Sequence, residues 1–173
     1  MELTTTIMII APHEVQALTA PLRRQYALDK MICVPAHITI LYPFVPYEQL
    51  DAASEKLRQI CAEIEPFDIT VEGYGNFPRF IYMKPKNEVP IRNLCHRVFE
   101  AFPDYLPFRG VYGDTPTLHM TVGEFATEEE RAAAIMPVYK PITFRAERVH
   151  VMYGVEKLAL TWIAHSVIRL GEG

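Results

Sequence analysis

The chain has 173 residues, of which 50% are hydrophobic and 22% charged, and its formal net charge is −4 at pH 7. A chain of this size can bury one sizeable core, so we expect a single domain spanning residues 1–173. The acidic balance argues against an extended nucleic-acid-binding surface, because such surfaces neutralise many phosphates with Lys and Arg.

The cysteines and the N-terminus bear on where the protein works. Cys33, Cys61 and Cys95 are widely spaced and form no CxxC pair, which predicts neither a disulfide framework nor a zinc site. The apolar run Ile7–Ile10 is too short to span a membrane and lacks a basic signal-peptide start. We therefore expect a cytoplasmic monomer without a membrane partner.

The first 64 residues alternate between strand and helix patterns. Residues 4–11 and 37–41 are short β-branched segments that end near prolines, as strands do. Residues 13–25 predict a helix with Val15, Leu18 and Leu22 on one face. The clearest amphipathic helix follows, with apolar residues three and four positions apart: Leu50, Ala53, Leu57, Ile60 and Ile64.

The remaining residues continue this alternation. Glycines at Gly73–Asn76 predict a turn between strands at 67–74 and 79–83. A helix over 91–102 and a loop over 103–116 lead to a strand at 118–122. Thr127 then caps a helix with an acidic start that runs to about Met136. Two final strands are expected at 141–153 and 158–169.

A weak internal repeat relates the two halves of the chain. His37-x-Thr39 is followed by a helix, by Pro66–Ile69 and by two strands, and His119-x-Thr121 is followed by a helix, by Pro141–Phe144 and by two strands. This order predicts two similar lobes.

The two His-x-Thr segments are the leading candidates for a functional site. Strand side chains alternate between faces, so His37, Thr39 and Leu41 should share one face while Ile38, Ile40 and Tyr42 share the other. His119 and Thr121 are arranged in the same way. Taken alone, the pattern also fits half-buried histidines that bond neighbouring Thr hydroxyls in a sheet.

Paired histidines and threonines suit phosphate chemistry. Opening a 2′,3′-cyclic phosphate needs a base that takes a proton from water and an acid that gives one to the departing ribose oxygen. Imidazole can fill both roles, because its ordinary pKa is about 6.5. The Thr hydroxyls can hold the nonbridging phosphate oxygens, and no metal or cofactor is needed.

The segments around both motifs resemble a known family. Pro35–Phe44 and Thr117–Gly123 are similar to the paired signatures of the 2H phosphoesterase superfamily, in its 2′-5′ RNA ligase-like (LigT-like) branch. Phe77–Pro85 resembles the middle hairpin of that branch, and the order of elements agrees from about residue 5 to 170. Two departures are mild: Leu118 stands where Pro is common, and Met120 where Leu or Ile is usual.

The resemblance implies an α+β fold of two pseudo-twofold-symmetric lobes, with antiparallel or mixed sheets around a central cleft and helices outside. It implies cyclic phosphodiesterase activity, or reversible 2′-5′ RNA ligase activity, on a small nucleotide or an RNA terminus. The catalytic residues it carries over are His37, Thr39, His119 and Thr121. Because the two motifs are nearly equivalent, either histidine can be the acid or the base.

Further residues are candidates for substrate binding. Arg24, Arg79 and Arg109 fall at loop or strand edges, where a cation could meet a phosphate. Tyr82 and Trp162 fall at similar places in the two lobes and could stack on a base. For each of these, an ordinary surface or core role is the alternative.

Two other functions stay open. One is a binding module that recognises nucleotides or RNA ends without turnover. The other is a metal-dependent hydrolase that uses His37, His119 and a nearby carboxylate, for which Asp114 and Glu124 are closest to the second motif.

Overall fold

The computed structural model describes residues 3–27, 34–155 and 162–172. They form two four-stranded sheets in which every strand pairs antiparallel with its neighbours. Sheet A has the order β2 (His37–Leu41), β1 (Leu3–Ile10), β7 (Arg148–Val155) and β8 (Ile163–Arg169). Sheet B has the order β5 (Met120–Glu124), β4 (Phe80–Pro85), β3 (Phe67–Phe77) and β6 (Ile142–Ala146).

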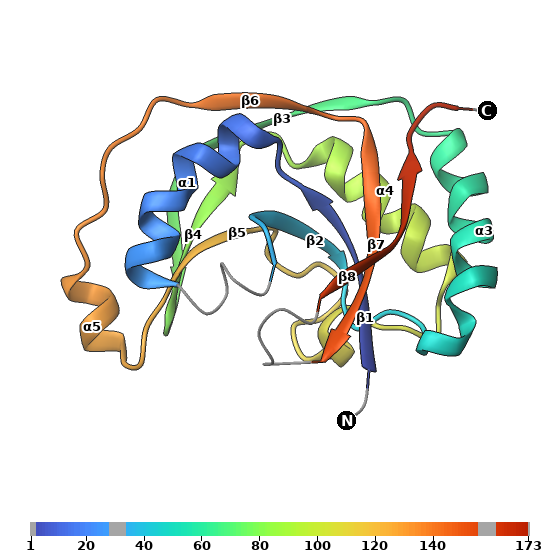
Figure 1. Cartoon of the computed structure of the whole chain (residues 1–173), viewed down its shortest axis with the longest axis horizontal. Helices are drawn as coiled ribbons and strands as arrows, with labels where there is room; N and C mark the ends of the chain where they lie inside the picture. Colours follow the sequence, from blue (N-terminus) through green and yellow to red (C-terminus); the bar gives the residue numbers. More distant parts are fainter. Residues whose placement is uncertain (1–2, 28–33, 156–161, 173) are drawn as a thin grey trace.

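The helices lie outside the sheets, as Figure 1 shows. They are α1 (His13–Tyr26), α3 (Leu50–Ala62), α4 (Val89–Ala101) and α5 (Glu128–Ala133), with short 3₁₀ turns η1 (Tyr47–Gln49) and η2 (Pro107–Gly110). Helix α1 follows a sheet A strand yet contacts β5 of sheet B, and α4 follows a sheet B strand yet contacts β2 of sheet A. This reciprocal crossing ties the two lobes together and confirms the bilobal α+β arrangement.

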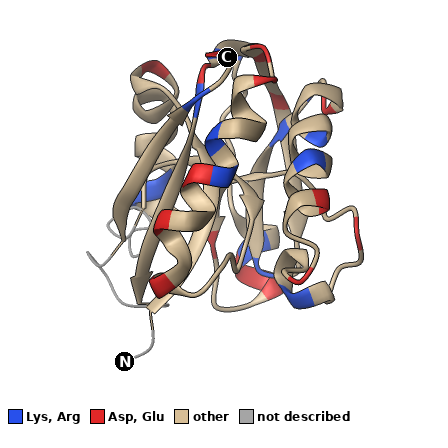
Figure 2. Cartoon of the chain, turned by 90° about the vertical axis from the view of Figure 1, so that its right-hand side faces the viewer, with Lys and Arg blue, Asp and Glu red and all other residues tan. Residues whose placement is uncertain are grey.

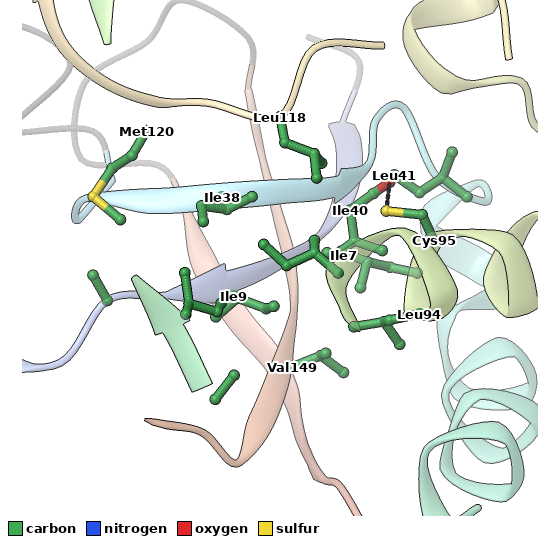
Figure 3. Close-up of a cluster of buried hydrophobic side chains, with 14 of the residues drawn as sticks. Ile7, Ile9, Ile38, Ile40, Leu41, Leu94, Cys95, Leu118, Met120 and Val149 are labelled. Carbon is green, nitrogen blue, oxygen red and sulfur yellow. Dashed lines mark hydrogen bonds between the residues drawn. The ribbon is translucent and has the colours of Figure 1, made fainter. Parts of the chain in front are cut away.

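The buried core draws on both sheets and on the helices. Ile7, Ile38 and Leu41 of sheet A are fully buried, as is Met120 of sheet B. Cys95 of α4 lies beside Ile40 and its thiol approaches the Ile40 carbonyl, while Leu94 of the same helix packs in the same cluster (Figure 3). The alternation of strand side chains thus directs one face of β2 into this core.

The turn predicted at Gly73–Asn76 is wrong. Strand β3 continues to Phe77, and the hairpin reverses at Pro78 and Arg79. Gly73 has a φ of 68° and lies where the pairing with β4 shifts register between Val71 and Tyr74. Glycine suits this irregularity within the strand, because a residue with a side chain disfavours a positive φ.

The single strand predicted over 141–153 is also wrong. Strand β6 pairs with β3 in sheet B, and after Glu147 the chain continues as β7, which pairs with β1 in sheet A. The apolar residues predicted as one strand therefore contribute to both lobes.

The segments matched by the repeat, at Pro66 and Pro141, precede strands that pair with each other in sheet B. The equivalent units are β1–α1–β2 and β4–α4–β5.

Smaller differences concern element ends and single residues. Helix α5 ends at Ala133, before Met136, and Leu18 on α1 is 37% exposed, whereas Thr19 is buried. Cys33 and the predicted strand start at 158–161 lie outside the described residues; Cys61 and Cys95 are free thiols.

The surface carries charges of both signs. Figure 2 shows basic and acidic residues interspersed along the helices. Within the described ranges, no helix is long and apolar enough to cross a membrane.

Candidate functional site

The two motif strands meet at the centre of the molecule. Strand β2 forms one edge of sheet A, β5 forms one edge of sheet B, and these edges contact each other (Figure 1). His37 is the first residue of β2, and His119 immediately precedes β5. The sequence repeat therefore places equivalent motifs at one junction between the lobes.

Each motif strand carries a β-bulge directly after its threonine. In sheet A, Thr39 pairs with Met8 and Leu41 with Ile7, so Ile40 is the extra residue. In sheet B, Thr121 pairs with Tyr82 and Gly123 with Ile81, so Val122 is extra. A bulge redirects the side chains that follow it, which explains why Leu41 enters the core although its spacing predicted the face of His37 and Thr39.

Both histidine rings are anchored in the same way. The Nδ1 atom of His37 lies 2.8 Å from the Pro35 carbonyl oxygen, and that of His119 lies 2.7 Å from the Thr117 carbonyl oxygen. A carbonyl oxygen only accepts, so each Nδ1 carries the hydrogen and each neutral ring keeps its lone pair on Nε2. An Nε2 lone pair can take a proton, and a protonated Nε2 can give one.

The two threonines are half-buried beside the rings. Across residues 3–27, 34–155 and 162–172, neither the Thr39 nor the Thr121 hydroxyl makes a hydrogen bond to a protein group. A hydroxyl without a protein partner is free to donate to a ligand oxygen. Among the described residues, neither histidine therefore bonds to the threonine of its own motif, and a backbone carbonyl holds each Nδ1 instead.

Aromatic rings surround His119. Phe77 and Tyr82 approach its ring at steep angles, with centroids 5.2 and 5.6 Å away. Phe108 stacks on it with centroids 6.4 Å apart and planes at 29°. Burial lowers the pKa of His119, and the hydrogen bond to Thr117 opposes this only in part. Such an environment favours the neutral imidazole, which is the form a general base requires.

Phe108 also reaches the other motif. Its backbone N–H donates to the carbonyl of Tyr42, the residue that follows β2. Phe108 and Arg109 have φ angles of 50° and 57°, in the left-handed region that side chains disfavour. No sequence periodicity marks a loop residue, so Phe108 could not be identified from the chain alone, and neither could Phe77.

The structure brings only some of the other predicted site residues to the motifs. Tyr82 is brought to His119, although it is buried. The Nε of Arg79 donates to the Phe125 carbonyl over 2.9 Å, and Arg109 is exposed next to Phe108. Arg24 is exposed in the last turn of α1, and Trp162 is half-buried before β8. Within the described part of the chain, neither bonds or stacks with the motif residues.

The register corrects the expected equivalence of Tyr82 and Trp162. Tyr82 pairs with Thr121, and the residue that pairs with Thr39 in the other lobe is Met8. Among the described residues, no group of three or more His, Cys, Asp or Glu side chains is placed to hold a metal ion.

Comparisons with known proteins bear on the family and the fold. The model of the 2′-5′ RNA ligase superfamily matches residues 11–157. E. coli LigT complexed with 3′-AMP has a similar structure, with a TM-score of 0.74 and 15% identity over 98% of this chain and 99% of LigT. No curated protein sequence matches.

Two further solved structures share the fold. TT0787 of Thermus thermophilus has a TM-score of 0.67 and 19% identity, over 97% of this chain and 98% of its own. A structure described as a phosphoesterase has a TM-score of 0.68 and 13% identity, over 96% and 98%. The likeness covers both lobes, so it establishes the whole two-sheet fold.

Proposed function

Because the chain belongs to the 2′-5′ RNA ligase superfamily, we propose that it is a cytoplasmic, monomeric cyclic phosphodiesterase acting through His37, Thr39, His119 and Thr121. The substrate is a 2′,3′-cyclic phosphate on a small nucleotide or an RNA end. Hydrolysis opens the ring to a phosphomonoester. The same ring opening, with the 5′-hydroxyl of a second RNA end in place of water, is 2′-5′ ligation, and its reverse cleaves the 2′-5′ linkage.

The observation that carries the proposal is the equivalence of the two motifs. Each histidine donates from Nδ1 to the carbonyl two residues earlier, and each threonine is followed by a bulge. Ordinary packing gives no reason for two distant segments to share both details. A reaction that needs one proton acceptor and one proton donor explains why both segments share these details.

The proton balance follows from this arrangement. His119, which its aromatic surroundings keep neutral, takes a proton from the attacking water through Nε2. The new P–O bond forms as the bond to one ribose oxygen breaks. His37, protonated on Nε2, gives its proton to that oxygen. The Thr39 and Thr121 hydroxyls donate to the nonbridging oxygens, where negative charge grows.

Other residues complete the proposed site. Arg109 and Arg79 are candidate cations for the phosphate charge, and Arg109 is the better placed because it adjoins Phe108. Tyr82 acts on the site through its contact with His119. Arg24 and Trp162 have the weakest support. LigT, which shares the fold, has been crystallised with NADP⁺, with phosphate and with ATP, which suits a site for nucleotides.

The test is turnover of 2′,3′-cyclic nucleotides in the presence of EDTA, followed by ³¹P NMR. We expect the cyclic phosphate signal to be replaced by that of a monoester, with no effect of EDTA. Absence of turnover for every base would contradict the proposal. Activity that EDTA abolishes would instead favour a metal-dependent hydrolase.

The second candidate is a binding module of the same fold. The observation that favours it is that His119 is half-buried among three rings, which cover part of the imidazole. Binding of a cyclic nucleotide in a titration, without product after long incubation, would select this function over the enzyme.

A further inference from the structure

A third histidine lies on the same face of sheet A as the first motif. Thr39 pairs with Met8, and Met8 pairs with His150 of β7. Directly paired residues in neighbouring strands share a face, so Thr39 and His150 flank the buried Met8. Two strand spacings separate their backbones by about 9–10 Å. His150 is therefore within one nucleotide of the proposed reacting phosphate.

The His150 ring is incompletely satisfied by the protein. Its Nδ1 is buried and has no hydrogen-bond partner among the described residues, and the side chain as a whole is half-buried. Burial, helped by the charge of Arg148, lowers its pKa, so the ring is neutral near pH 7. A buried N–H without a partner is less tolerable than a bare acceptor. The hydrogen therefore belongs on Nε2, which makes that atom a donor for another molecule.

In sheet B, the row of paired residues that corresponds to Thr39, Met8 and His150 is covered by a side chain. There Thr121 pairs with Tyr82, and Tyr82 pairs with Gly75. The Tyr82 ring lies over this glycine: a Cβ at Gly75 would be 2.5 Å from its Cζ atom. Sheet B thus fills with an aromatic ring the position where sheet A has a histidine. At this position, a ligand that extends beyond the reacting phosphate meets an imidazole on sheet A and the phenol ring of Tyr82 on sheet B.

A positive charge adjoins His150. Arg148 lies two residues earlier on β7, so its side chain emerges on the same face. Its side chain is 48% exposed, and its guanidinium lies 3.6 Å from the Glu147 carboxylate, which leaves it partly hydrated. An N–H donor beside a cation suits a phosphate oxygen better than an uncharged base.

We propose that His150, with Arg148 beside it, forms a second subsite that holds the phosphodiester on the 5′ side of the reacting nucleotide. This inference rests on the proposed function and makes an RNA end, rather than a free mononucleotide, the preferred substrate. In RNA that ends in a cyclic phosphate, this phosphodiester is the next anion along the chain.

The experiment compares a 2′,3′-cyclic mononucleotide with a diribonucleotide that ends in a 2′,3′-cyclic phosphate. We expect wild-type kcat/KM to be about 10-fold higher for the diribonucleotide, as one hydrogen bond to a charged group provides. His150→Leu should abolish this preference while kcat/KM for the mononucleotide is unchanged. His150→Gln, which keeps an N–H donor, should retain part of it. Arg148→Gln should reduce it, and the Arg148 contribution should fall with added salt.

The matched control is Val167→Ala, because Val167 is the 48% exposed partner of His150 on β8. The inference would be overturned if His150→Leu kept the full wild-type preference for the diribonucleotide. It would also be overturned if the folded variant lost kcat/KM equally on both substrates. If His150→Leu does not fold by circular dichroism, His150→Gln and Arg148→Gln decide.

Failure of the proposed function gives a different result. If the wild-type protein hydrolyses neither substrate, the enzyme assignment fails, and the subsite is judged by titration. His150→Leu must then weaken binding of the diribonucleotide about 10-fold and leave that of the mononucleotide unchanged. Equal affinities for the wild-type and variant proteins would overturn the subsite.

Discussion

Phe108 stacks on the ring of His119 with centroids 6.4 Å apart, while its backbone N–H donates to the carbonyl that follows the other motif strand. One residue thus contacts both halves of the proposed site. It does so with a φ of 50°, a conformation that costs on the order of 1–3 kcal/mol. The surrounding contacts hold the loop in this shape and position the His119 ring.

Phe108→Ala should lower kcat about 10-fold and change KM less, because the ring positions His119 and does not itself carry the reaction. Uncovering His119 also removes part of its desolvation, so its pKa should rise toward the ordinary value of about 6.5. Since the base must be unprotonated, the acid limb of the pH–rate profile should move to higher pH. Val111→Ala, at a 72% exposed site in the same loop, is the control. An unchanged kcat and profile in Phe108→Ala would refute this role.

The threonine hydroxyls can be tested by near-isosteric changes. Thr39→Val and Thr121→Val should each lower kcat about 10²-fold, because each removes one donor to the charged transition state. Thr39→Ser and Thr121→Ser keep the hydroxyl and should keep most of the activity. Thr143→Val, at an exposed position on β6, should behave as wild type. Val variants as active as the Ser variants would show that the hydroxyls do not contact the substrate.

Stability should fall as pH decreases below about 6.5. Burial lowers the pKa of both His119 and His150. The unfolded chain therefore binds more protons than the folded one between the lowered values and about 6.5, and stability rises with pH in that window. Melting temperatures at pH 5.5 and 7.5 measure the effect.

The difference between these two melting temperatures should shrink in His150→Gln and in His119→Asn. His96→Asn, at an exposed position on α4, should leave it unchanged. If His150→Gln and His119→Asn both keep the full wild-type difference, burial of these rings does not govern the pH dependence.

Local sequence patterns predicted most helices and strands, because side chains buried at regular intervals appear in the sequence as regularly spaced apolar residues. Helix α3 and strand β2 lie where their apolar spacing placed them. The patterns failed where consecutive residues belong to strands of two different sheets, and where a strand contains an irregularity. The apolar residues on both sides of Glu147 read as one strand, although β6 and β7 belong to different lobes.

The motif histidines and threonines were identifiable because a residue type and a two-residue spacing define them. Their surroundings were not. Phe108 and Phe77 reach His119 through tertiary packing, and the row from Thr39 to His150 depends on pairing across β1. Both are long-range relationships with no local signature.

The central claim is that His37 and His119 act together on one phosphate. Its most direct test is the rate of ring opening in His37→Asn, His119→Asn and the double variant, measured with a 2′,3′-cyclic nucleotide by ³¹P NMR. Each single change should lower kcat by about 10²–10⁴-fold. The double change should add little to either, since residues that act as a unit are not additive. Two singles that retain most activity, or losses that multiply in the double variant, would contradict the account.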